Sequence, residues 1–83
     1  MDGQEVIPLY AFVEGDTIVT LLLASTSTTM RELIAHAERS AGVRLGPGTR
    51  RWVVFGGVSI RPEVTVRKAG MGALDRFDVR SLS

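Results

Sequence analysis

Residues 29–42, TMRELIAHAERSAG, decide the fold because they predict the one long helix of this chain. Thr29 and Glu32 have the spacing of a capping box, in which each side chain bonds a free backbone amide of the first turn. Apolar residues then recur at helical spacing, so one face of the helix is apolar. Gly42 is the type of residue that commonly ends a helix. We therefore expect a helix over residues 30–41.

Two segments that favour strands precede this helix. Residues 6–13 are rich in β-branched and aromatic side chains, and residues 17–24 continue with a run of aliphatic ones. Between them, Glu14-Gly15-Asp16 predicts a tight turn, since glycine takes a positive φ without strain. We expect an N-terminal hairpin that continues through the hydroxyl-rich residues 25–29 into the helix.

The part of the chain after the helix predicts short strands separated by turns. Residues 43–49 contain a Gly-Pro-Gly sequence and are expected to form a loop. Residues 51–55 and 58–60 are expected strands on either side of a diglycine turn. Residues 64–72 fit either a short helical turn or an irregular crossing. Residues 75–82 alternate between apolar and charged side chains, which predicts a final strand.

The order of these segments predicts an α+β fold of the ubiquitin-like β-grasp type. A single helix has to cover one face of a mixed sheet of four or five strands. The connection from the second strand through the helix to the third is expected to be right-handed, which leaves the last strand to pair in parallel with the first. With 83 residues in total, the chain is expected to form one domain over residues 5–82.

Composition narrows the classes of function. The chain is 45% hydrophobic and 23% charged, with a net charge of +1 and no cysteine. So small a net charge gives no support to nucleic-acid binding, and the arginines fit better at the rim of a protein interface. A cysteine-free domain of this size favours a reducing compartment, and neither a signal peptide nor a membrane span is recognisable. We expect a cytoplasmic protein that binds no membrane.

No set of residues predicts catalysis. The single histidine, His36, lies four residues after Glu32, and a metal site would need three or four ligands. Asp75 and Asp78 are three apart on an expected strand, so they face opposite sides and are surface charges. We therefore expect no catalytic residue, no metal ligand and no cofactor-binding residue.

The C-terminal sequence bears on a different class of function. It is Arg80-Ser81-Leu82-Ser83 and lacks the terminal diglycine that ubiquitin-like modifiers and sulfur carriers use. Conjugation and sulfur transfer are therefore disfavoured.

The strongest functional indication is an excess of apolar residues in the strands. In a two-layer domain the face away from the helix should be polar, yet the first strand is apolar at both parities. In the second strand, if Val19, Leu21 and Leu23 face the helix, then Ile18 and Leu22 face outward; the sequence leaves open which parity is inward. The side chains that we expect to contact a partner are Tyr10, Phe12, Ile18, Leu22, Trp52 and Val54.

An exposed apolar surface of this kind is typical of an interaction site. The favoured occupant is a larger, different protein. Self-association and coverage by the chain's own loops are the two alternatives.

Short sequence features, in a fixed order over about 75 residues, resemble one family. The chain is similar to the B component, or gamma subunit, of toluene-4-monooxygenase-type hydroxylases. The features that carry this resemblance are Ile7-Pro8, Phe12, Asp16, residues 19–23, Thr29-Met30, residues 44–47, residues 61–66, Gly70-Met71 and residues 75–79.

The resemblance implies a non-catalytic accessory subunit with a ubiquitin-like fold. Such a subunit would dock on the alpha subunit of a bacterial di-iron monooxygenase hydroxylase that oxidises aromatic compounds or alkenes, and the di-iron site would lie in that other chain. The alternative is a generic ubiquitin-like interaction module in a different complex.

Overall fold

The computed structural model describes residues 5–41 and 50–82. Gly42 and the expected loop over residues 43–49 lie outside the described residues. The elements in chain order are β1 (Val6–Val13), β2 (Thr20–Ser25), α1 (Met30–Ala41), β3 (Arg50–Phe55), β4 (Val58–Ile60), α2 (Val66–Ala69) and β5 (Arg76–Leu82).

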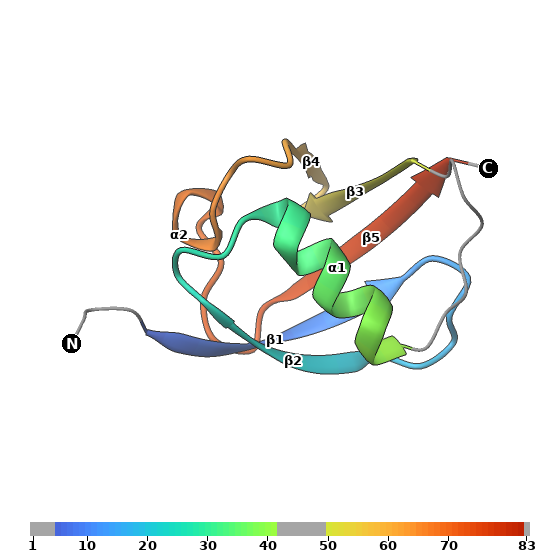
Figure 1. Cartoon of the computed structure of the whole chain (residues 1–83), viewed down its shortest axis with the longest axis horizontal. Helices are drawn as coiled ribbons and strands as arrows, with labels where there is room; N and C mark the ends of the chain where they lie inside the picture. The colour runs from blue at the N-terminus through green and yellow to red at the C-terminus, as the bar shows by residue number, and fades with distance from the viewer. Residues whose placement is uncertain (1–4, 42–49, 83) are drawn as a thin grey trace.

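The strands form one sheet in the order β2-β1-β5-β3-β4. The pair formed by β1 and β5 is parallel, whereas β1–β2, β3–β5 and β3–β4 are antiparallel. The helix α1 lies across one face of this sheet (Figure 1). The ubiquitin-like β-grasp fold is therefore confirmed, including the parallel pairing of the last strand with the first.

The start of α1 follows the expected capping chemistry. The backbone N–H of Thr29 donates to Glu32 Oε1 at 2.9 Å, and the N–H of Glu32 donates to Thr29 Oγ1 at 3.2 Å. These two bonds satisfy amides that have no partner within the helix. The apolar stripe of α1 is buried against the sheet through Met30, Leu33 and Ala37.

The second strand begins later than the sequence predicts. The turn at Gly15 has the expected positive φ of 94°, but the loop continues beyond it. Asp16 Oδ1 accepts a hydrogen bond from the N–H of Ile18 at 3.1 Å, which holds the chain in a bend. As a result β2 covers residues 20–25 instead of 17–24.

The segment that the sequence left ambiguous contains one short helix, α2. Its first turn is capped by Thr65, whose Oγ1 accepts the N–H of Lys68 at 3.2 Å. Gly70 ends it with a φ of 82°. The N–H of Val66 donates to the carbonyl of Thr28 at 2.7 Å, so α2 closes the end of the domain at which α1 begins.

The core lies between α1 and the sheet and corrects one expectation. Leu22 is only 5% exposed and pairs with Leu9, which is fully buried. The expectation that Leu22 faces outward is therefore wrong, and Leu21 and Leu23 face outward in its place. The cause is the register of the hairpin: residues paired across strands share a face, and Leu9 lies on the helix side.

Candidate protein-docking face

The face of the sheet opposite α1, which we call the outer face, is where apolar side chains remain exposed. Its members follow from the strand registers, because side chains of paired residues lie on the same face. On this face β5 contributes mainly charged side chains, β1, β2 and β3 contribute mainly apolar ones, and β4 contributes a serine. The outer face consists of Val6, Pro8, Tyr10, Phe12, Leu21, Leu23, Ser25, Arg50, Trp52, Val54, Ser59, Arg76, Asp78, Arg80 and Leu82.

Its most exposed apolar part is formed by β1 and β2. Tyr10 pairs with Leu21, and Pro8 pairs with Leu23, in adjacent rows. Leu21 is 56% exposed and Leu23 is 63% exposed, although both stand in the middle of a strand. Aliphatic side chains that stay this exposed beside an aromatic ring are typical of a contact surface.

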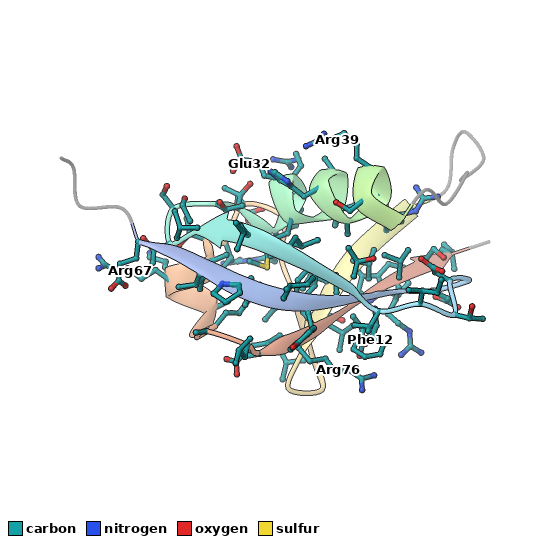
Figure 2. The ribbon with its side chains drawn as sticks, turned by 90° about the horizontal axis from the view of Figure 1, so that it is seen from below. Phe12, Glu32, Arg39, Arg67 and Arg76 are labelled. Atoms are coloured by element: carbon teal, nitrogen blue, oxygen red, sulfur yellow. The ribbon has the colours of Figure 1, made fainter. Side chains whose placement is uncertain are left out.

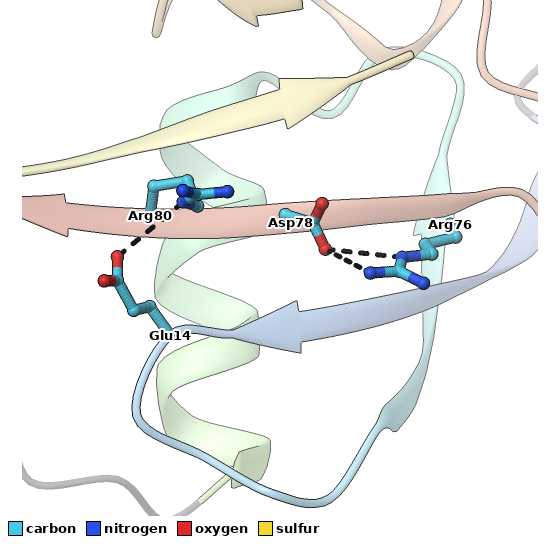
Figure 3. Close-up of polar contacts among 4 residues, drawn as sticks. All are labelled: Glu14, Arg76, Asp78 and Arg80. Carbon is cyan, nitrogen blue, oxygen red and sulfur yellow. Dashed lines mark hydrogen bonds and ion pairs between the residues drawn. The ribbon is translucent and has the colours of Figure 1, made fainter. Parts of the chain in front are cut away.

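The charged side chains in the middle of the outer face are paired with one another. The guanidinium of Arg76 lies over the ring of Phe12, 3.8 Å from the ring centroid. Its Nη2 is 3.2 Å from Asp78 Oδ1. Figure 2 shows Phe12 and Arg76 together on the side of the sheet away from α1, and Figure 3 shows the ion pair. Arg76 is thereby held flat against the sheet.

A second pair closes the end of this face. The Nε of Arg80 lies 3.8 Å from Glu14 Oε1 (Figure 3), and the same carboxylate oxygen accepts the N–H of Ser81 at 2.8 Å. Glu14 follows β1, so these contacts tie the end of β1 to β5. The outer face therefore has balanced charge along β5, flanked by apolar side chains on β1 and β3.

The structure separates the six expected contact residues into three groups. Tyr10, Phe12, Trp52 and Val54 lie on the outer face, with Tyr10 exposed and the other three half-buried. Ile18 is exposed, but it lies in the loop before β2 and not on the sheet. Leu22 belongs to the core.

Sequence reasoning did not single out four exposed leucines, Leu21, Leu23, Leu74 and Leu82. For Leu21 and Leu23 it left open which parity of the strand faces inward, and it named Leu22 as the contact residue. Leu74 lies in the loop before β5 and is 59% exposed, and its N–H donates to the carbonyl of Pro8 at 2.7 Å. Leu74 also has a φ of 68°, which leucine rarely adopts. No sequence pattern indicates that conformation.

The helix side of the domain carries a polar hollow. It is lined by Ser25, Ser27, Thr28, Glu32, Ala35, His36 and Arg39. The Ser25 and Thr28 hydroxyls bond each other and close the turn between β2 and α1. His36 is exposed.

Two further features bear on function. Within residues 5–41 and 50–82, no three His, Cys, Asp or Glu side chains come close enough together to hold a metal ion. In the same part of the chain, no helix has both the length and the apolar character needed to cross a membrane.

The family follows from a sequence comparison. Residues 6–80 match the model of the family described as toluene-4-monooxygenase system protein B (TmoB). The chain belongs to that family. The matched segment includes both helices, the first four strands and β5 up to residue 80, so the family assignment and the β-grasp fold concern nearly the same residues. No curated protein sequence shows significant similarity to the chain.

Solved structures agree on the fold. A chain from a toluene 4-monooxygenase HD complex with the inhibitor 4-bromobenzoate is 20% identical, with a TM-score of 0.74 over 90% of this chain and 96% of that one. A Caldiarchaeum subterraneum ubiquitin is 12% identical, with a TM-score of 0.78 over 95% and 96%. A chain from a structure titled "Molecular Mimicry of SUMO promotes DNA repair" is 16% identical, with a TM-score of 0.79 over 95% of both chains.

Proposed function

We propose that this TmoB-family chain is a non-catalytic accessory subunit of a bacterial multicomponent di-iron monooxygenase, and that it docks through its outer face on the alpha subunit of the hydroxylase. The observation that carries the proposal is the exposed apolar surface formed by β1 and β2 on a family member whose described residues present no metal cluster. In this role the chain contributes surface and shape to the complex, and the oxidation chemistry belongs to the partner.

The energetics favour a partner over an exposed state. Burial of a leucine side chain contributes about 1.5–3 kcal/mol, and Leu21 and Leu23 retain more than half of their surface in the isolated chain. The ion pairs of β5 are already formed, so Arg76 need not find a new partner when the face is covered. An ordinary interface buries about 800 Å² per partner, which is a modest share of this chain's 5310 Å².

Co-expression with the alpha subunit of a di-iron monooxygenase hydroxylase tests the proposal. We expect the chain to co-elute with the alpha subunit on size exclusion. Leu21→Asp places a charge in the most exposed apolar part of the outer face, which β1 and β2 form, and we expect it to abolish co-elution. Val58→Asp is the matched control, because Val58 is 59% exposed but lies on β4 at the opposite edge of the sheet.

Two results would contradict the proposal. One is a folded chain that never co-elutes with a hydroxylase subunit. The other is a complex that Leu21→Asp and Val58→Asp weaken equally, because the partner would then not recognise the surface formed by β1 and β2. Circular dichroism of both variants verifies that each has folded.

A further inference from the structure

The edge of the sheet at β2 has a free backbone face. Within the described part of the chain, β2 pairs with β1 and has no strand on its other side. The N–H groups of Tyr10 in β1 and of Glu14 directly after it donate to the carbonyls of Asp75 and Val79. Even-numbered residues of β1 therefore direct their backbone groups at β5, and odd-numbered ones direct theirs at β2.

This alternation determines which groups of β2 are free. Leu9 points its backbone at β2 and pairs with Leu22, so Leu22 is bonded to β1. Its neighbours Leu21 and Leu23 consequently direct their N–H and C=O groups away from β1, toward the open edge. Each of these two residues presents one donor and one acceptor to an incoming strand.

The open stretch has a definite end. The N–H of Ser25 donates to Thr28 Oγ1 at 3.0 Å, and the carbonyl of Ser25 accepts the N–H of Thr28 at 3.1 Å. The chain's own turn thus occupies the edge at Ser25. The free part of the edge is centred on Leu21 and Leu23, whose side chains belong to the exposed apolar part of the outer face.

Nothing in the strand itself protects this edge. Natural edge strands commonly carry a lysine, a proline, an inward-pointing charge or a bulge that prevents pairing with another chain. The β2 strand reads TLLLAS and contains none of these residues, and its register with β1 runs from Ala24 to Thr20 without a bulge. Such an edge is a template for strand addition.

We propose that an extended segment of the hydroxylase partner adds to this edge as a sixth strand. The segment pairs its backbone with Leu21 and Leu23 and carries aliphatic side chains at alternate positions, which continue the exposed row on the outer face. This inference rests on the proposed function, because it specifies how the partner contacts the same surface.

A second copy of the chain fits the edge less well. Two copies paired edge to edge through β2 would form one continuous sheet with their outer faces side by side. The outer face would then remain uncovered, and Leu21, Leu23 and Tyr10 would stay exposed to solvent. That contact also falls short of the roughly 800 Å² per partner of a stable interface, because each edge offers the backbone of only Leu21 and Leu23. A larger partner covers the edge and the adjoining face together.

Amide hydrogen exchange tests the inference on the complex of the full chain with the hydroxylase subunits. Exchange is quenched and located to single residues by fragmentation mass spectrometry. We expect the amides of Leu21 and Leu23 to exchange rapidly in the free chain and at least tenfold more slowly in the complex. The amide of Leu22, already bonded to β1, serves as the internal control and stays protected in both states.

A backbone variant provides the second measurement. Leu23→Pro removes the N–H that faces the open edge and leaves the bonds from β2 to β1 in place, a position at which sheets tolerate proline. Leu23→Ala shortens the side chain and keeps that N–H. We expect Leu23→Pro to bind the hydroxylase about tenfold more weakly than Leu23→Ala, the effect of one lost hydrogen bond that leaves its acceptor unpaired.

The outcomes separate the two proposals. A complex in which the Leu21 and Leu23 amides stay unprotected overturns strand addition and leaves the docking proposal standing. Protection that appears in the isolated chain as its concentration rises overturns it in favour of a second copy. The absence of any complex overturns the proposed function and this inference with it. If Leu23→Pro fails to fold, the exchange data on the unmodified chain decide.

Discussion

Leu74 combines an unfavourable backbone conformation with an exposed apolar side chain. A positive φ costs a non-glycine residue about 1–2 kcal/mol, and Leu74 has a φ of 68°. Its N–H donates to the carbonyl of Pro8, so the loop holds Leu74 beside the β1 residues of the outer face. Residues held in such sparsely populated backbone conformations cluster at functional sites.

This conformation predicts that glycine at position 74 is more stable than alanine, the reverse of the usual order of stability. We expect Leu74→Gly to be more stable than Leu74→Ala by about 0.5–1 kcal/mol, because glycine relieves the strain while alanine keeps it. Urea unfolding of both variants measures the difference. At the exposed neighbour Ala73, whose φ is not positive, replacement by glycine should lower stability. A Leu74→Ala variant as stable as Leu74→Gly would contradict the assigned conformation.

The residues also show where sequence reasoning reaches its limit. The alternation of Phe77, Asp78, Val79 and Arg80 predicted a strand, and its apolar side is the buried one, because polar and apolar side chains differ in the free energy of burial. Residues 21–23 are all leucine, so no such difference distinguishes the buried Leu22 from its exposed neighbours. The face of the sheet on which each of these leucines lies depends on the register of the hairpin alone.

Among the elements, both bounds of α1 were predictable from the sequence, whereas the bounds of β2 were not. The helix carries its own signals, a capping box and a regular apolar stripe, and both act between residues close in sequence. The start of β2 depends on a bend held by Asp16 and Ile18. That hydrogen bond lengthens the loop before β2 by a few residues, and the amino-acid composition of the segment gives no sign of it. The strand therefore begins at Thr20 instead of Thr17.

An ion pair connects α1 to β3 and predicts a stability difference. Arg51 Nη1 lies 3.2 Å from Glu38 Oε2, with the Arg51 side chain only 11% exposed. Removal of the carboxylate from a largely buried guanidinium is destabilising, and because Glu38 is itself partly solvated we expect Glu38→Gln to lower the free energy of unfolding by about 1–2 kcal/mol. Chemical denaturation measures it.

The chain offers a matched control for this pair. Arg61 and Glu63 also form an ion pair, at 3.6 Å, but both side chains are largely exposed. Exposed pairs contribute little because water screens them, so Glu63→Gln should leave the denaturation midpoint nearly unchanged. Equal effects of the two substitutions would show that α1 is not held to β3 through Glu38.

At the scale of the whole molecule, α1 covers one face of the sheet, and within residues 5–41 and 50–82 no further layer covers the other face (Figure 2). The hydrophobic core lies on the helix side of the sheet and extends from Leu9 on β1 to Val53 on β3. On the outer face the charges of β5 pair with each other while the leucines of β2 stay exposed. We infer that the missing layer on that side belongs to another protein.

The most direct measurement of this claim is a calorimetric titration of the chain into the hydroxylase subunits at several temperatures. Burial of apolar surface gives binding a negative heat-capacity change. We predict binding with such a change, and a loss of both affinity and heat-capacity change in the double variant Leu21→Ala, Leu23→Ala. Equally tight binding by the double variant, with the same heat-capacity change, would contradict the account.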